Sequence, residues 1–129
     1  MVLPDTSVWV EYLRRGDRGR AGEIDELVAR QKVVTCAPVV AELLAGTSRA
    51  DRARLAAVLA ALPWAELGRA QWIRVGGVAA ELRGAGLAVP LTDVEIAVAA
   101  VEARATLWSA DSDFERVAGS LENLELRPL

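Results

Sequence analysis

Short apolar segments alternate with helical patterns along the whole chain, and this alternation limits the folds that the sequence can adopt. Segments typical of buried strands are Met1–Asp5, Val33–Cys36, Thr106–Ser109 and Leu124–Leu126. Between them, apolar residues recur at the three-to-four-residue spacing of helices. Strands separated by helices pair in parallel through right-handed crossovers. We therefore predict an α/β fold, a single three-layer α/β/α sandwich with a small parallel sheet.

Local signals predict where several of these elements begin and end. Pro38 suits the first turn of one helix, and Thr92 is expected to cap another that runs to Arg104. The glycine pair at positions 76 and 77 is expected to interrupt or weaken a helix over Arg69–Arg83. Pro4 removes one hydrogen-bond donor from the first strand, so we expect a local adjustment there. The 129 residues fit one domain, residues 1–129, without a linker or an internal repeat.

Acidic side chains stand where the expected strands end. Asp5 directly follows the first strand, and Glu42 lies about one turn into the helix after the second strand. Asp111 and Asp113 follow the Thr106–Ser109 strand. In parallel α/β sheets, ligands bind beyond the carboxyl ends of the strands. Taken singly, each acid could instead cap a helix, occupy a first turn or lie on the surface.

Asp93 is unusual for its position on its own helix. At about 100° per residue, Glu95 and Glu102 share one stripe, which is the natural solvent face. Asp93 points nearly opposite, in line with Ala97 and Ala100. An acid on the apolar side of a helix is poorly solvated unless it has a partner, a cation or an open cleft.

The composition restricts the chemistry that these acids can perform. The chain has no histidine, one cysteine, 18 acidic residues and 15 basic residues. A Ser-His-Asp triad, a histidine metal site and a thiolate zinc site are therefore excluded within one chain. Converging carboxylates repel each other, and a divalent cation is the simplest way to hold them ionised. All-oxygen ligands suit Mg²⁺ or Mn²⁺, which can meet phosphate oxygens and supply an activated water.

The charge and hydropathy also bear on partners and location. Acids gathered around a cation leave the remaining surface close to neutral or basic, so the net charge of −3 does not exclude a nucleic-acid substrate. The longest apolar run, Leu55–Ala65, is too short to span a bilayer. No basic-then-apolar signal peptide is present at the N-terminus. We therefore expect a cytoplasmic protein without a membrane partner.

The acids lie in four short segments whose order and spacing are informative together. Their sequences are DTSVW at residues 5–9, APVVAEL at 37–43, LTDVEIA at 91–97 and SADSDF at 109–114. These segments resemble the PIN-domain ribonucleases, specifically the VapC toxins of bacterial toxin–antitoxin modules. The resemblance covers essentially the whole chain. It implies a small α/β/α sandwich whose acidic cleft binds Mg²⁺ or Mn²⁺ and cleaves RNA.

The resemblance also implies roles for individual residues. Four acids look like the catalytic, metal-binding quartet, and they are Asp5, Glu42, Asp93 and Asp111. Asp113 looks like a further acid at the same metal site. Ser109 stands where the family often has threonine, and its hydroxyl could orient a carboxylate or a water. Thr6 is a second accessory hydroxyl that could contact the site.

Partners and alternatives follow from the same comparison. The family implies a homodimer, a cognate antitoxin that fills the cleft, and an RNA substrate for which transfer RNA is one candidate. An aspartyl-phosphate phosphatase or receiver-like domain is one alternative, although these enzymes usually need a lysine near the site and Lys32 precedes the second strand. A catalytically silent, partner-binding PIN domain is another alternative, although such domains typically lose one of the acids.

Overall fold

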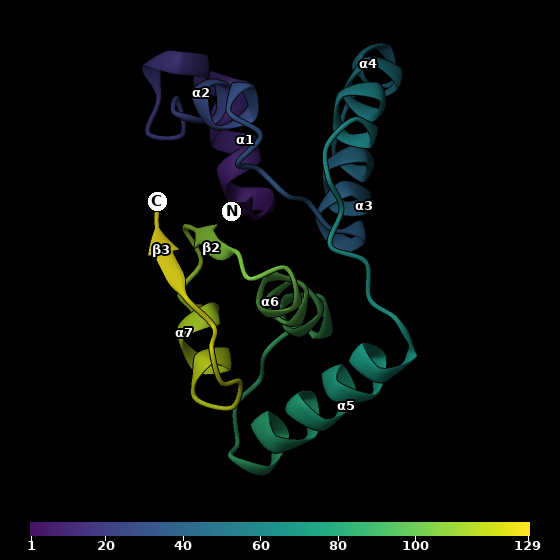
Figure 1. Ribbon diagram of the computed structural model, residues 1–129, viewed down its shortest axis with the longest axis vertical. Coiled ribbons are helices and arrows are strands. Elements are labelled where there is room, and N and C mark those ends of the chain that lie inside the picture. Colours follow the sequence, from purple (N-terminus) through teal and green to yellow (C-terminus); the bar gives the residue numbers. More distant parts are fainter.

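Seven α-helices and three short strands follow one another in the computed structural model, which describes all residues 1–129 (Figure 1). The first half contains β1 (Val2–Pro4), α1 (Thr6–Arg15), the 3-10 turn η1 (Gly16–Arg18), α2 (Ile24–Ala29), α3 (Ala37–Ala45) and α4 (Arg49–Ala60). The second half contains α5 (Arg69–Gly84), α6 (Leu91–Glu102), β2 (Thr106–Ser109), α7 (Asp113–Ala118) and β3 (Leu126–Pro128).

The three strands form one parallel sheet in the order β1-β2-β3. Leu107 in the central strand lies opposite Leu3 on one side and Leu126 on the other. The last strand starts two residues later than the sequence predicts. Asn123 adopts a left-handed φ of 65° and turns the chain just before it, so pairing with β2 begins only beyond that turn.

The segment Val33–Cys36 does not form the predicted strand. It makes two isolated parallel bridges, one pairing Val33 with Val2 and one pairing Thr35 with Trp64. On this edge of β1, the Val2 amide donates to the carbonyl of Lys32 at 2.7 Å. The next donor on the same edge of a strand is two residues further on, and Pro4 has no N–H to give. The local adjustment expected at Pro4 therefore appears in the neighbouring segment Val33–Cys36, which pairs with β1 through a single bridge.

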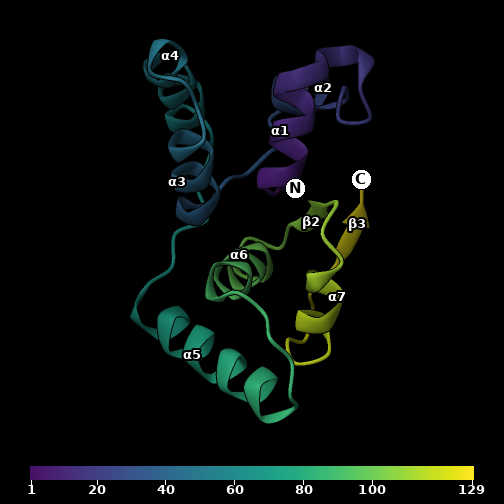
Figure 2. The same ribbon diagram turned by 180° about the vertical axis from the view of Figure 1, so that it is seen from behind.

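Helices lie on both sides of these strands, as the two opposite views show. In both views α1 and α2 lie to one side, α5 and α7 lie to the other, and α6 occupies the centre (Figures 1 and 2). The central helix contacts α3, α5, α7 and β2. Its side chains from Ile96 to Ala100 are almost completely buried. This arrangement confirms the predicted α/β sandwich with a small parallel sheet.

The helix α6 starts two residues earlier than the sequence predicts, and this difference bears on the site. Thr92 does not cap this helix, because the helix already begins at Leu91 and Pro90 is its N-terminal neighbour. The carbonyl of Pro90 accepts a hydrogen bond from the Asp93 amide at 3.1 Å. Asp93 therefore lies in the first turn of α6, where the helix dipole favours a negative charge.

The helix α5 runs continuously through Gly76 and Gly77, so of the two expected effects, interruption or weakening, the interruption is wrong. One face of the helix buries Val75, Val78 and Leu82, and this packing outweighs the poor helix propensity of two glycines. Although α5 is the longest helix, at 16 residues, neither it nor any other helix has the length and apolar character needed to cross a membrane.

Replacing Gly76 with alanine is expected to raise the free energy of unfolding by about 0.5–1 kcal/mol. A Cβ at this position meets no atom within 4 Å, so the substitution removes backbone entropy from the unfolded chain without a clash. Urea denaturation of the two proteins measures the difference. A lower free energy of unfolding in the variant would mean that α5 needs glycine at this position.

Candidate metal centre

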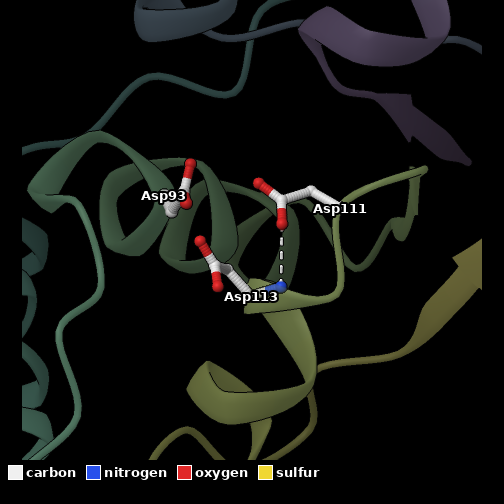
Figure 3. A group of neighbouring side chains, drawn as sticks. All are labelled: Asp93, Asp111 and Asp113. Atoms are coloured by element: carbon white, nitrogen blue, oxygen red, sulfur yellow. Dashed lines mark hydrogen bonds between the residues drawn. The ribbon is translucent and has the colours of Figure 1, made fainter.

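Three aspartates converge beside the carboxyl end of β2. Asp93 comes from the first turn of α6, Asp111 from the loop after β2, and Asp113 from the first residue of α7. One carboxylate oxygen of each lies within 4.8 Å of the others. Figure 3 shows the three carboxylates turned toward a common point. The Asp113 amide donates to Oδ1 of Asp111 at 2.9 Å, which ties the two loop acids together.

The convergence of the three carboxylates changes the pKa of one of them. The pKa of Asp93 is raised from its ordinary value to about 6, first by burial and then by the negative charges of Asp111, Asp113, Glu42 and Asp5. One basic group lies at the edge of the cluster, where a guanidinium nitrogen of Arg116 approaches Oδ1 of Asp113 at 3.5 Å. Clustered hard oxygen donors with excess negative charge fit Mg²⁺ or Mn²⁺.

Asp5 lies outside this cluster and has different surroundings. Its side chain is only 5% exposed and caps α1, with Oδ1 accepting a hydrogen bond from the Val8 amide at 3.2 Å. The same oxygen accepts from the hydroxyl of Ser7, and Oδ2 accepts from the hydroxyl of Ser109, each at 2.5 Å. Burial raises the pKa of Asp5, while these hydrogen bonds act in the opposite direction. The hydrogen bonds therefore favour an ionised carboxylate at a buried position.

Glu42 approaches the site from α3. Its carboxylate is exposed, and Oε1 accepts a hydrogen bond from the hydroxyl of Thr6 at 3.2 Å. Neither Glu42 nor Asp5 belongs to the group of acids within 4.8 Å of one another, although both contribute to the raised pKa of Asp93. The structure thus brings three of the five expected metal ligands together and places the other two around them.

Two residues with contacts at the site were not selected from the sequence. Ser7 bonds to Asp5 and also accepts a hydrogen bond from the Ala110 amide at 3.0 Å. Its signal in the sequence is a hydroxyl two residues after a strand-end acid, in the first turn of a helix. Arg116 pairs with Asp113 three residues earlier on the same helix, which is a common helical spacing for ion pairs.

A family model described as the PIN domain matches residues 2–120. The chain belongs to the PIN domain family. The resemblance seen in the four acidic segments is thereby confirmed, and the acid cluster lies within the matched part of this PIN domain.

Curated relatives of this PIN domain carry nuclease names. The VapC ribonuclease Mb1587 of Mycobacterium bovis is 30% identical over 123 residues, which is 92% of either chain. Ribonuclease VapC11 of Mycobacterium tuberculosis matches to the same extent. The alignments cover nearly the full length of each protein.

Solved structures share the fold at lower identity. The structure of VapBC2 from Rickettsia felis, bound to a DNA fragment from its promoter, matches with a TM-score of 0.76 and 22% identity. That match covers 100% of this chain and 99% of the other. VapBC-1 from nontypeable Haemophilus influenzae matches with a TM-score of 0.75 and 19% identity, over 99% and 98% of the two chains. At these identities the likeness establishes a common fold.

The raised pKa of Asp93 predicts how the stability of the metal-free PIN domain depends on pH. The folded state holds this proton more tightly than the unfolded state, because the pKa rises from 3.8 to about 6 on folding. The stability that Asp93 contributes is therefore fully present below pH 3.8 and is lost as the pH rises through about 6.

Melting temperatures from pH 4 to 7 in EDTA, for the wild type and Asp93→Asn, test this dependence. Asparagine cannot titrate, so the melting temperature of the variant relative to wild type is expected to increase across this range. If the melting temperatures of the two proteins change with pH in the same way, the ionisation of Asp93 does not destabilise the folded protein.

Proposed function

We propose that this PIN domain is an endoribonuclease that depends on Mg²⁺ or Mn²⁺ and serves as the toxin of a toxin–antitoxin pair. The observation that carries the proposal is the convergence of Asp93, Asp111 and Asp113 at the carboxyl end of a parallel sheet. Relatives at 30% identity that are named ribonucleases support it.

The residues divide into those that would hold a cation and those that would support them. Asp93, Asp111 and Asp113 would bind it, and Asp5 and Glu42 would add negative charge beside it. Such a cation, when bound, supplies positive charge for the phosphodiester oxygens and lowers the pKa of a water that can act as the nucleophile.

The chain's own groups prepare the site for this chemistry. The hydroxyls of Ser7 and Ser109 orient the carboxylate of Asp5, and the hydroxyl of Thr6 orients that of Glu42. Arg116 holds one oxygen of Asp113 from the outer side. Because the chain has no histidine, proton transfer at this site falls to carboxylates and water.

The products of RNA cleavage test the proposal. Purified protein with Mg²⁺ and a mixed RNA substrate is expected to leave a 5′-phosphate and a 3′-hydroxyl, which end-labelling and sequencing of the fragments identify. Products ending in a 2′,3′-cyclic phosphate would contradict hydrolysis by an activated water. Sequencing would also show whether transfer RNA is cut, as we propose from the family resemblance.

We further propose that a cognate antitoxin controls the protein in the cytoplasm and that the toxin is a homodimer. The structural neighbours named VapBC support an antitoxin partner, since their names combine the two components. A groove between α1 and α4 offers such a partner an apolar surface, and it is lined in part by Trp9, Tyr12, Leu13, Leu55 and Val58. The side chains of Leu13 and Val58 in this groove are about half exposed.

The alternative of an aspartyl-phosphate enzyme loses support. Lys32, the single lysine, is exposed in the segment before the Val33 bridge and makes no ion pair with an acid of the cluster. A silent, partner-binding PIN domain is opposed by the presence of all five acids. Expression in cells separates the silent domain from the toxin, since only a toxin is expected to arrest growth and to lose this effect on substitution of Asp5.

A further inference from the structure

The hydroxyl of Ser7 joins two parts of the site that are far apart in the sequence. It donates to Oδ1 of Asp5 at 2.5 Å and accepts from the Ala110 amide at 3.0 Å. A serine hydroxyl has one proton and two lone pairs, so both bonds can form together. A short O–H···O distance is typical of a hydroxyl that donates to a carboxylate. Ser7 therefore connects the end of β1 to the loop after β2.

Ser109 forms a second connection with the same pattern. Its hydroxyl donates to Oδ2 of Asp5 at 2.5 Å and accepts from the Asp111 amide at 2.8 Å. The two oxygens of Asp5 thus each hold one serine hydroxyl, and each hydroxyl holds one amide of the 110–111 loop. The buried carboxylate of Asp5 is the fixed point of both connections.

The loop held in this way carries an acid of the metal centre. Asp111 is exposed, and Ala110 beside it is also exposed, so little packing restrains either residue. Hydrogen bonds from Ser7 and Ser109 to the backbone supply that restraint instead. The Asp113 amide in turn donates to Oδ1 of Asp111, which extends the connection to the next acid.

We propose that Ser7 is a positioning residue of the metal centre: its hydroxyl holds the Ala110–Asp111 loop against Asp5 and thereby fixes the carboxylate of Asp111. The inference rests on the proposed function and deepens it, because it assigns a role to a residue that contacts no substrate. Groups that orient metal ligands typically change metal affinity or activity by about 10–100-fold when they are removed.

Four variants of the full chain isolate the hydroxyl. Ser7→Ala removes it, and Ser7→Thr keeps it. Ser112→Ala makes the same chemical change in the loop that carries Asp111, at a hydroxyl that forms no hydrogen bond within the chain. Ser7→Cys, which keeps the side-chain shape but donates weakly, serves as a second test where Ser7→Ala folds poorly.

Two measurements separate positioning from a general effect on folding. Calorimetric titration with Mn²⁺ is expected to give a dissociation constant about tenfold higher for Ser7→Ala than for wild type. Ser7→Thr and Ser112→Ala are expected to stay within about twofold of wild type. Amide exchange followed by NMR is expected to accelerate at Ala110 in Ser7→Ala, because that amide loses its acceptor.

Each outcome of these titrations decides the proposal. Unchanged Mn²⁺ affinity in folded Ser7→Ala or Ser7→Cys would overturn it, as would an equal loss in Ser112→Ala. A wild type that binds Mn²⁺ but cleaves no RNA refutes the ribonuclease and still allows the titrations to decide the role of Ser7. A wild type that binds no Mn²⁺ refutes both.

Discussion

Replacing Asp93 with asparagine is expected to reduce Mg²⁺-dependent RNA cleavage by at least about a hundredfold. Asparagine has nearly the same shape as aspartate, so the first turn of α6 and its buried neighbours remain in place. The substitution removes one of the three carboxylates that lie within 4.8 Å of one another. It also removes a charge that burial and the neighbouring acids disfavour, the two causes that raise the pKa of Asp93 to about 6. The variant is therefore expected to be at least as stable as wild type without metal.

Asp51→Asn is the matched control for this substitution. Asp51 occupies the third residue of α4, just as Asp93 occupies the third residue of α6, but it is exposed and pairs with Arg54 at 3.0 Å. An exposed pair of this kind contributes little to stability, so this variant is expected to cleave RNA at the wild-type rate. Equal activity in wild type and Asp93→Asn would remove Asp93 from the catalytic site.

Chelation of divalent cations is expected to abolish cleavage altogether. If the cluster holds a catalytic cation, EDTA would remove both the charge that offsets the repulsion among the acids and the positive charge available to the phosphate. Addition of excess Mg²⁺ or Mn²⁺ is expected to restore the rate. Full activity in EDTA would show that the reaction does not use the acid cluster as a metal site.

Metal binding can also be measured without RNA, from the melting temperature of the protein at increasing Mn²⁺ concentration. A ligand that binds only the folded state, at a hundred times its dissociation constant, stabilises that state by about 2.7 kcal/mol. The melting temperature of wild type is therefore expected to rise with Mn²⁺, and that of Asp93→Asn is expected to rise much less. A common shift in both proteins would indicate binding elsewhere on the surface.

Most of the site could be predicted because its acids follow simple positional rules. Asp5, Asp111 and Asp113 were expected together because parallel strands end at one edge of the sheet, and the structure has that sheet. Asp93 was selected because it lies on the buried side of its helix, and the neighbouring residues from Ile96 to Ala100 are indeed almost fully buried. The sequence could not show that Asp5 and Glu42 lie outside the tightest group, because that depends on side-chain distances.

The errors in the predicted elements have physical reasons that single residues do not reveal. The glycine pair in α5 predicts an interrupted or weakened helix, but burial of Val75, Val78 and Leu82 on one face keeps it continuous. The strand at Val33–Cys36 is reduced to isolated bridges because Pro4, on a different segment, lacks the donor for the next rung. The sequence does not reveal the contact of Ser7, because its partner Ala110 lies 103 positions away along the chain.

Calorimetric titration of Mn²⁺ into the wild type and Asp111→Asn tests the central claim most directly, because it detects the metal centre without any assumption about the RNA. Asp111 is exposed, so its substitution is expected to leave the core intact, as circular dichroism of both proteins can check. We expect saturable binding to the wild type and a dissociation constant raised at least about tenfold in the variant. Absence of binding to the wild type, or equal affinity in the two proteins, would contradict a carboxylate metal centre at this site.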